Sequence, residues 1–577
     1  MNVIIFSGGT GSASLAKGLM EFNPYLNITS IINCYDNGLS TGFCRKLLNV
    51  LGPSDLRKNQ YRFYELSNIV DHRIKDLFNG RENLNEQVEP RSYVLNKVCN
   101  ELGFIQFEKY INYFFDVFKE KEYGKSYLKD FNLANIIYAA MFKVDGYEKT
   151  ISFFKNFLHI DNNVILNSYN NTFIYGVTDC DRHYPEEELV KLNRSDEKIV
   201  NVIFDAVDKA DNTNEAELHI KIQEKILEAD LIVFSAGTQW SSLIPTYKYN
   251  NLYKIINKAK GEKIFVMNNE PDLDMVSEGS LEILTNVERF LDLSNTNILI
   301  NKDANPKMQI ITDQYNYTFS SMWNIDGRHK DSRLAKKIFN IYFADLFHAE
   351  HLLFDFDDTI FGRDVQDEKV IKVSHDNFKL LSELTKYVDI SIVSGNSYRK
   401  IKNALLVSFG LDYEIPYTVW ADGGIVKYNN GKMSDVNPKY VVYCHEMVIN
   451  DIKILDLSCD IRPNKEAPTC ISIKPINDKR LKKIVREFFE LKHGQNNRVV
   501  FAGRESVDIL RKDTNKVNIL SSKEFKNKRL FYIGDEADFS KGNDYAIAKK
   551  CSGYYNVKNV FETNTLLRFL KVELENA

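Results

Sequence analysis

Long apolar runs and clustered cysteines are two features that this 577-residue sequence lacks. A membrane-spanning helix needs about 20 mostly apolar residues, and no stretch approaches that length. The eight cysteines form no Cys-x-x-Cys pair, which argues against a zinc ribbon or a disulfide framework and suits a reducing compartment. The start of the chain, 1–6, lacks the basic region and cleavage site of a signal peptide. We therefore expect no membrane association and a cytoplasmic location.

An excess of charge of one sign is also missing. Lysine and arginine number 75, aspartate and glutamate 79, and the net charge is −4. Nucleic-acid-binding proteins usually carry an excess of basic residues, so this charge balance argues against nucleic-acid binding. With 44% hydrophobic residues the chain can bury real cores, which excludes wholesale disorder. At roughly 100–200 residues per domain, several globular units are expected.

Short apolar runs alternate with helical patterns, which predicts an α/β fold with mostly parallel sheets. Strands are expected at 2–6, 28–33, 231–235, 263–268, 351–356, 390–394 and 530–534. A charged stretch followed by the amphipathic stretch 334–347 divides the chain into two modules, 1–342 and 343–577. Each is expected to be a Rossmann-like sheet with helices on both faces. An aromatic stretch between about 60 and 160, with helical spacing typical of a core, predicts a helical insertion.

The most specific pattern lies at the first strand of the second module, where Asp355 and Asp357 follow 351–354 directly. Carboxylates at i and i+2 after a strand can serve one site. One can attack phosphorus as a nucleophile, while the other exchanges protons with the leaving and attacking oxygens. Such a pair alone is weak evidence, because acidic loops are often solvated surface.

Three later segments strengthen that interpretation. Ser394 follows another strand and precedes a glycine, which suits a hydrogen bond to a phosphate oxygen. Lys516 supplies an ammonium to neutralise a nucleophile and a phosphate. Asp535 follows a further strand and Asp544 lies shortly after it, where carboxylates would hold Mg²⁺, a cation that prefers oxygen ligands.

These four segments, in this order, resemble the motifs of the haloacid-dehalogenase (HAD) phosphatase superfamily over about 350–577. The resemblance implies that Asp355 is the nucleophile, Asp357 the acid/base, and Ser394 and Lys516 the phosphate ligands. It implies Mg²⁺ as the cofactor, with ligands drawn from Asp355, Asp357, Asp535 and Asp544, and a small phosphate ester as the substrate. Lys516 lies 122 positions after Ser394, which leaves room for a small α+β cap at about 426–500, as in the phosphomannomutase and sugar-phosphatase branch.

The first module opens with a glycine-rich loop between a strand and a helix. Its backbone N–H groups and the helix N-terminus favour a phosphate or diphosphate, although a tight turn explains the pattern nearly as well. Two further loops follow, which can also be read as polar turns, and a fourth cluster opens another helix. The candidate residues of these four segments are Gly8, Gly9, Thr10 and Gly11; Asp36 and Ser40; Asp55 and Arg57; and Gly237, Thr238 and Ser241, to which Asn268 is added at the end of the next strand.

Together these loops resemble the 2-phospho-L-lactate transferase and gluconeogenesis-factor family (CofD-like and YvcK-like proteins) over about 1–330. Three positions depart from the family pattern: Asn37 replaces a second aspartate, and Ser235-Ala236 replaces Gly-Pro. The resemblance implies a guanosine or uridine nucleotide conjugate as ligand, with Asp36 at the metal or the acceptor hydroxyl. Members of the first type transfer a phospholactyl group with Mg²⁺, whereas members of the second type bind nucleotide-sugars or dinucleotides in regulation.

We therefore expect a bifunctional enzyme in which a nucleotide-dependent transferase is fused to a capped phosphatase. The alternative is a nucleotide-sensing module that controls the phosphatase, and Asn37 mildly favours it because losing an acid weakens a metal site. The sequence is compatible with a homodimer but does not determine the oligomeric state.

Overall fold

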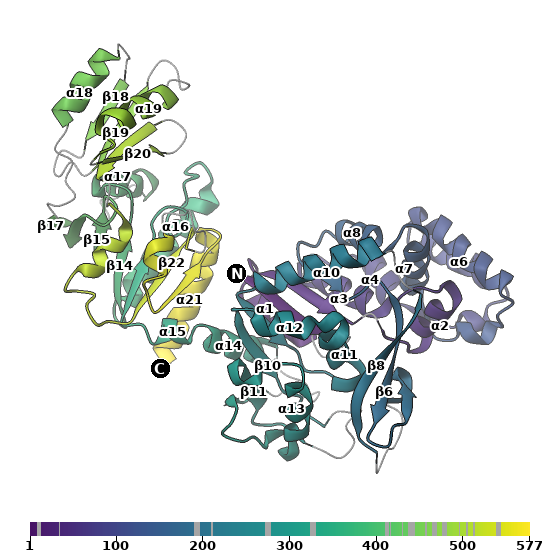
Figure 1. Cartoon of the computed structure of the whole chain (residues 1–577). Helices are drawn as coiled ribbons and strands as arrows, with labels where there is room; N and C mark the ends of the chain where they lie inside the picture. Colours follow the sequence, from purple (N-terminus) through teal and green to yellow (C-terminus); the bar gives the residue numbers. More distant parts are fainter. Residues whose placement is uncertain are drawn as a thin grey trace. The chain divides into compact units, whose positions relative to one another are not determined.

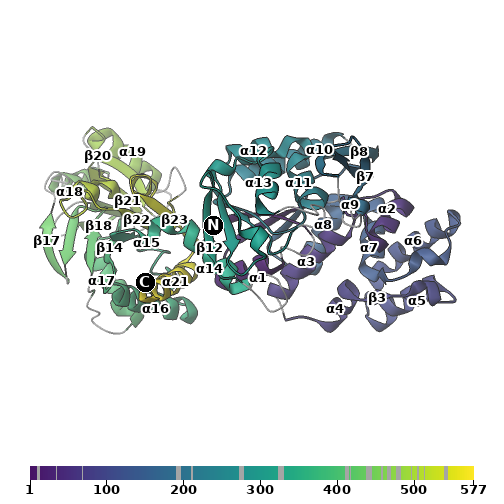
Figure 2. The same cartoon turned by 90° about the horizontal axis from the view of Figure 1, so that it is seen from below.

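The chain forms two compact units, Met1–Tyr342 and Phe343–Ala577. The computed structural model describes residues 1–577 except 9–12, 34, 68, 190–196, 209–211, 272–278, 323–330, 410–414, 416, 430, 437–444, 456–458, 464–469, 476–481, 496, 503–505, 512–513, 538–543 and 577. Each unit is an α/β structure with helices against a central sheet (Figure 1, Figure 2). The α/β class and the mostly parallel sheets expected from the sequence are confirmed.

The sheet of the first unit has seven parallel strands. Their order is β12-β11-β10-β9-β1-β2-β5, with β1 (Asn2–Ser7) between β9 (Leu231–Phe234) and β2 (Asn27–Ile32). From β1 the sheet continues on one side with β2 and β5, and on the other side with β9, β10, β11 and β12. The strand order therefore reverses between β1 and β9, and the loops after these two strands diverge there, as at the ligand-binding edges of open parallel sheets. The remaining strands are β5 (Asn163–Leu166), β10 (Glu262–Val266), β11 (Asn297–Asn301) and β12 (Asn316–Ser320).

The helices of the first unit include those expected after the first strand and at the end of the module. The last of them, α14, packs on α1, with the rings of Phe22 and Phe339 stacked at 4.1 Å. The helices are α1 (Ala13–Phe22), α2 (Leu39–Leu48), α3 (Ser54–Ser67), α4 (His72–Asn79), α5 (Pro90–Leu95), α6 (Glu108–Glu120), α7 (Leu133–Val144), α8 (Tyr147–Phe157), α9 (Glu186–Leu189), α10 (Asn212–Leu227), α11 (Ile244–Lys248), α12 (Leu252–Lys258), α13 (Ser280–Glu288) and α14 (Asp331–Tyr342).

The aromatic stretch expected as a helical insertion forms α4 to α8, and its rings are core. Phe107, Phe114 and Phe131 are fully buried, and Tyr138 stacks on Phe154 at 3.8 Å. Buried stacked rings of this kind add specific packing to their apolar burial. The aromatic residues of this region therefore hold the insertion together, as their helical spacing indicated.

One element of the first unit was not anticipated from the sequence. A three-stranded antiparallel sheet of order β7-β6-β8 is built from β6 (Asn171–Thr178), β7 (His183–Pro185) and β8 (Ile199–Asp208). Along β6 buried and half-buried residues alternate in part. Such a pattern is a weaker sequence signal than the continuous apolar runs of the parallel strands.

The sheet of the second unit is mixed, with order β17-β16-β15-β14-β13-β22-β23. Its central strand β13 (His351–Phe354) is fully buried and pairs in parallel with β14 (Asp389–Val393) and β22 (Leu530–Gly534). The other strands are β15 (Thr418–Ala421), β16 (Val426–Asn429), β17 (Lys432–Val436) and β23 (Gly553–Asn556). The helices are α15 (Ala344–Phe347), α16 (Glu368–Leu384), α17 (Tyr398–Phe409), α20 (Tyr545–Ala548) and α21 (Val560–Asn576).

The segment expected to form a cap begins and ends later than the sequence suggested. A separate antiparallel sheet contains β18 (Cys459–Pro463), β19 (Cys470–Pro475), β21 (Ser506–Arg511) and β20 (Asn497–Ala502), in that order. The helices α18 (His445–Ile454) and α19 (Lys482–His493) pack on one of its faces through a cluster of buried residues: Val448, Ile452, Ile471, Ile473, Val485, Phe489, Val499, Val507 and Ile509.

The boundary at 426 is therefore corrected. Residues 426–436 form β16 and β17, which extend the edge of the main sheet by antiparallel pairing with β15. The reason is the turn at Asp422, Gly423 and Gly424, which have φ values of 53°, 71° and 85° and reverse the chain directly after β15. Two of these three residues are glycines, which adopt positive φ at little cost.

Within the described part of the chain, none of the helices combines the length and the apolar character needed to cross a membrane.

Candidate functional site

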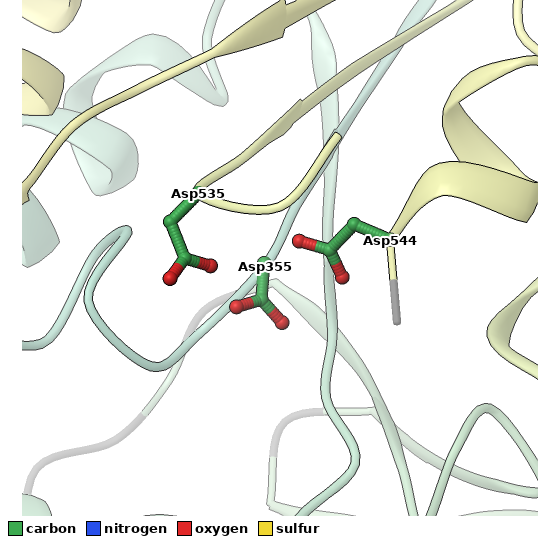
Figure 3. Close-up of side chains that lie close together, drawn as sticks. All are labelled: Asp355, Asp535 and Asp544. Carbon is green, nitrogen blue, oxygen red and sulfur yellow. The ribbon is translucent and has the colours of Figure 1, made fainter. Parts of the chain in front are cut away.

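The carboxyl ends of two neighbouring parallel strands bring Asp355 and Asp535 together in the second unit. Asp355 follows β13 and Asp535 follows β22, and the N–H of Asp355 donates to the carbonyl of Ile533 at 2.8 Å. Asp544 lies just before α20. Carboxylate oxygens of these three residues all lie within 4.8 Å of one another, and Figure 3 shows the side chains pointing toward a common centre.

Lys516 connects two members of this carboxylate cluster (Asp355, Asp535 and Asp544). Its Nζ donates to Oδ1 of Asp355 and to Oδ1 of Asp544, each at 2.5 Å. The ammonium is buried, with 4% of the residue exposed, at the start of the 3₁₀ helix η11 (Lys516–Ser521). A buried charge of this kind is stable only when paired and hydrogen-bonded, so Lys516 and its two carboxylates form one electrostatic unit.

Burial and mutual repulsion shift the titration of this cluster. Burial, and then the charge of Asp544, raises the pKa of Asp355 well above its usual value, against the lowering effect of Lys516. Burial and Asp544 also raise the pKa of Asp535 to about 6. Burial by itself would lower the pKa of Lys516, but the two carboxylates beside it raise that pKa above normal. Additional positive charge at this centre would relieve the repulsion.

The donor set fits a hard divalent cation. Three carboxylates with converging oxygens are the ligands that Mg²⁺ prefers, and Mg²⁺ is commonly held by few carboxylates together with substrate phosphate. Asp357, expected among the metal ligands, is not one of the three carboxylates whose oxygens converge here among the described residues. Its Oδ2 instead accepts a hydrogen bond from Nδ2 of Asn396 at 2.6 Å.

Asn396 is a site residue that the sequence analysis did not assign. Its Oδ1 accepts a hydrogen bond from Nζ of Lys400 at 2.6 Å. Because an ammonium only donates, the amide nitrogen of Asn396 must face Asp357. The backbone of Asn396 is held on both sides, since its N–H donates to Oγ of Ser394 at 3.0 Å and its carbonyl accepts from the N–H of Asp422 at 2.8 Å. The signal was the Ser-Gly-Asn sequence directly after β14.

Ser394, expected as a phosphate ligand, is buried with 1% of the residue exposed. Its N–H donates to the carbonyl of Trp420 at 2.9 Å, and its carbonyl accepts from the N–H of Gly423 at 2.9 Å. These bonds hold the ends of β14 and β15 together. Ser394 therefore lies at the same carboxyl edge as Asp355.

His351, at the start of β13, carries a prediction about stability. The ring is buried and its Nε2 lies 2.8 Å from Oγ of Ser391. Burial lowers the pKa of His351 to about 4, against the attraction of Glu524 and Asp389 and together with repulsion from Lys528 and Lys427. The unfolded chain therefore binds the proton more readily, and stability should fall as the pH drops from about 6.5 to 4, by about 3 kcal/mol from this group.

The measurement is the free energy of unfolding between pH 7 and 4 for the wild type and for His351→Gln. The glutamine amide keeps a polar group near Ser391 without a titrating ring, so this variant should lose that part of the pH slope. Equal slopes in the two proteins would contradict the assignment.

In the first unit, polar groups from three strand ends meet at one edge of the sheet. Asn33, directly after β2, donates from Nδ2 to the carbonyls of Ser241 and Ser242 at 3.3 Å each. A Cβ on Gly8, directly after β1, would lie 2.5 Å from Oγ of Ser242. The loop after β1 and the π-helical segment η5 (Gln239–Leu243) are thus adjacent. The predicted residues Gly9, Thr10 and Gly11 lie outside the described residues.

The cluster after β9 is ordered by its own side chains. The N–H of Gly237 donates to Oδ1 of Asn268 at 2.8 Å, and Nδ2 of Asn268 donates back to the carbonyl of Gly237 at 3.1 Å. Oγ of Ser241 donates to Oγ1 of Thr238 at 2.8 Å. The structure therefore brings Gly237, Asn268, Thr238 and Ser241 together beside the end of β1.

Asp36 and Asp55 are close enough to influence each other. Oδ1 of Asp36 accepts from the N–H of Gly38 at 3.1 Å, and Oδ1 of Asp55 lies 3.5 Å from Nζ of Lys58. Burial, followed by the charge of Asp36, raises the pKa of Asp55 to about 6. Asp36 and Asp55 therefore contribute negative charge at the carboxyl edge of the first unit's sheet.

Arg57 and Ser40 meet through a residue of the insertion. Nε of Arg57 donates to Oδ1 of Asn135 at 2.9 Å, and Nδ2 of Asn135 donates to Oγ of Ser40 at 3.1 Å. Nη1 of Arg57 donates to the carbonyl of Phe78. Only 4% of Arg57 is exposed, so these two nitrogens of the guanidinium already bind inside the fold. Asn135 had no motif around it that would have identified it.

The fold and these sites define a two-unit α/β protein: one unit with polar loops at a parallel-sheet edge, the other with a lysine-bridged carboxylate cluster. Residues 3–342, more than half of the chain, match the family described as 2-phospho-L-lactate transferase CofD. The chain belongs to the CofD family, which confirms the resemblance of the first module.

Similar proteins cover each part of the chain. A provisionally named gluconeogenesis factor of Thermotoga maritima is 24% identical over 354 residues, which cover 60% of this chain and 92% of that protein. A solved UPF0052 family protein from Bacillus halodurans covers 59% of this chain and 98% of its own, with 20% identity and a TM-score of 0.44. The C-terminal region matches a haloacid dehalogenase-like hydrolase from Bacteroides thetaiotaomicron, with 12% identity, a TM-score of 0.28, and 39% and 99% of the chains covered.

Proposed function

We propose that the second unit is a Mg²⁺-dependent phosphatase that hydrolyses a small phosphate ester through an aspartyl-phosphate on Asp355. The observation that carries this proposal is the buried carboxylate cluster with Lys516 at the carboxyl edge of the central strand. Lys516 holds Asp355 in place and offsets the charge of the incoming phosphate. Asp357 lies two residues further along the same loop, where a second carboxylate can transfer protons.

The chemistry has two displacements. In the first, a carboxylate oxygen of Asp355 bonds to phosphorus, the ester P–O bond breaks, and the leaving oxygen takes a proton from Asp357. In the second, a water attacks the aspartyl-phosphate, Asp357 takes its proton, and Asp355 is released with inorganic phosphate. Asp355, Asp535 and Asp544 would hold Mg²⁺, which supplies charge stabilisation on the transferring phosphoryl group when bound.

The test is hydrolysis of p-nitrophenyl phosphate and of a panel of sugar phosphates by the full chain, with Mg²⁺ and with EDTA. We expect turnover with Mg²⁺ and its loss in EDTA. A variant in which Asp357 is replaced by asparagine should accumulate phosphate on the protein, visible by mass spectrometry. Absence of turnover on every ester, with Mg²⁺ present, would contradict the proposal.

We propose that the segment containing β18 to β21 recognises the part of the substrate that is not phosphate. Its support is the position in the chain, between the residues of the Ser394 turn and Lys516, and its separate small core. Replacing side chains in this segment with alanine should change which phosphate ester is hydrolysed best. The hydrolysis of p-nitrophenyl phosphate should remain largely intact.

The first unit is proposed to transfer a phospholactyl-like or related phosphorylated group from a nucleotide conjugate. Membership of the CofD family supports this function, together with the acidic pair of Asp36 and Asp55 at the sheet edge. Thermal shift with GDP, GTP and UDP-sugars in Mg²⁺, repeated with Asp36→Ala, is the experiment. Guanine-selective stabilisation that depends on Asp36 supports a transferase.

A nucleotide-sensing role for the first unit is the second candidate. Two observations favour it: Asn37 stands where the family often has an acid, and a similar protein carries the name gluconeogenesis factor rather than transferase. A UDP-sugar or dinucleotide that stabilises the protein and changes the phosphatase rate without being consumed would establish this role.

Asn396 supplies a prediction for the phosphatase site. Because its amide orients Asp357, Asn396→Ala should lower kcat by about tenfold, a part of the 10²–10⁴-fold that a positioned acid/base contributes, while KM changes little. Ser397→Ala is the matched control, since Ser397 adjoins Asn396 and its hydroxyl accepts from the N–H of Lys400. Equal effects of the two substitutions would show that Asn396 has no special part in turnover.

A further inference from the structure

The first unit contains a cavity of about 620 Å³ that none of the proposed roles uses. It lies between α2, the short 3₁₀ helix η4 (Lys125–Leu128) and β6. Its lining combines cations, amides and aromatic rings: Asn37, Gly42, Phe43, Arg45, Lys46, Asn49, Ser126, Tyr127, Lys129, Asn171 and Phe173. No carboxylate is among these lining residues.

The charge of the lining is positive. Arg45 is 1% exposed, and its guanidinium donates to the carbonyls of Tyr35 and Thr172 at 2.7 and 2.6 Å and to Oδ1 of Asn171 at 3.2 Å. These three acceptors are neutral oxygens. Within the described ranges, neither Lys46 nor Lys129 lies in an ion pair, and both are exposed. The lining itself carries these cations and no carboxylate, which favours an anion.

The aromatic part of the lining is ordered for stacking. The rings of Phe43 and Tyr127 stack at 5.2 Å with an angle of 17°, and the guanidinium of Arg45 lies 4.2 Å from the ring centre of Phe173. Nζ of Lys46 is 5.6 Å from the ring of Tyr127. Tyr127 is 48% exposed, so part of a ring faces outward at a cavity rimmed by ammonium groups. A planar ring carrying a negative group satisfies both features at once.

We propose that this cavity binds a small aromatic anion, a planar ring that bears a sulfonate, carboxylate or phosphate group. Lys46 and Lys129 contact the anionic group, and the ring packs on Tyr127. Asn37 belongs to the cavity and follows Asp36 directly, so an occupant adjoins the acidic loop of the first unit. The site stands independently of the phosphatase and of the nucleotide proposed for the loop after β1.

The experiment uses the full chain and three probes that the phosphatase cannot hydrolyse: naphthalene-2-sulfonate, naphthalene-2-methanol and methanesulfonate. Isothermal titration should show binding of naphthalene-2-sulfonate, at least about tenfold weaker binding of the neutral naphthalene, and weaker binding still of methanesulfonate. Affinity should fall as salt is added, because the lysines are exposed.

Variants locate the binding. Lys46→Ala and Lys129→Ala should each weaken naphthalene-2-sulfonate binding by about five- to tenfold, and Tyr127→Ala should weaken it further. Lys149→Ala, an exposed lysine on α8 outside the lining, is the control and should leave affinity unchanged. The proposal is overturned if the probe does not bind at millimolar concentration, if the neutral naphthalene binds equally, or if the lining variants behave like Lys149→Ala.

Discussion

Replacing Asp355 with asparagine should abolish phosphate ester hydrolysis by the full chain, with a loss on the order of 10⁴-fold or more in kcat. The amide has the shape of the carboxyl group but is a poor nucleophile, so no aspartyl-phosphate forms. Steady-state kinetics with p-nitrophenyl phosphate and mass spectrometry of the protein measure both effects. The fold should remain, because Lys516 keeps its ion pair with Asp544 at 2.5 Å.

Asp358→Asn is the matched control for this substitution. Asp358 lies on the same loop, but its side chain is 39% exposed and forms an ion pair with Nε of Arg363 at 3.1 Å. We expect this variant to retain activity within about a factor of three, as substitutions of exposed paired residues have small effects. More than about 1% of wild-type activity in Asp355→Asn would refute the role of Asp355 as the nucleophile.

Replacing Lys516 with methionine should both inactivate the phosphatase and destabilise the second unit. Methionine keeps most of the apolar volume but leaves Asp355 and Asp544 buried without their shared cation. Removing one partner from a buried ionic unit costs about 3–5 kcal/mol. The measurement is the free energy of unfolding, with the signal of the second unit followed by thermal or urea denaturation.

This loss of stability should depend on pH and on Mg²⁺. The pKa of Asp355 is already raised by burial and by Asp544, and it rises further without Lys516. When the pKa of an acid is higher in the folded than in the unfolded protein, the protein loses stability as the pH rises. The variant should therefore be least stable at pH 8 and closer to wild type at pH 5. Mg²⁺ should restore part of the stability, because it binds the folded carboxylates.

Lys571→Met is the control for Lys516→Met. Lys571 lies on α21 and pairs with Glu383 at 2.7 Å, with about a third of each side chain exposed. Water solvates the remaining carboxylate of Glu383 once the lysine is gone, and the unfolding temperature should change little. A pH-independent loss in Lys516→Met, or a loss no larger than in the control, would contradict the electrostatic assignment.

The strand ends were the part of both sites that could be predicted from the sequence. β1, β13 and β22 are short apolar runs that end at glycine, serine or aspartate, and parallel strands place such ends at one edge. The resemblance to HAD phosphatases placed Asp355 and Asp535, which follow two of these strands, at one metal site. Mg²⁺ ligands at Asp535 and Asp544 remain a prediction, although the structure places both carboxylates in the cluster with Asp355.

The partners of the charged side chains could not be predicted. Arg57 belongs to a polar loop motif that suggested phosphate binding, yet its Nε donates to Asn135, which is 78 positions away on α7. Asp357 was expected beside the metal, whereas its carboxylate accepts from Asn396, 39 positions away on the next strand's loop. Neither partner has a local pattern that marks it.

The sequence by itself determined the α/β class, the seven strands that build the centre of both sheets, and the acidic and glycine-rich loops that follow them. The reason is that apolar periodicity and turn residues act over a few positions. Only the tertiary structure decided the burial of Lys516 between two carboxylates, the contact of Asn396 with Asp357, and the place of 426–436 in the main sheet. These depend on contacts between segments far apart in the chain, where packing and burial, rather than local preference, set which group meets which charge.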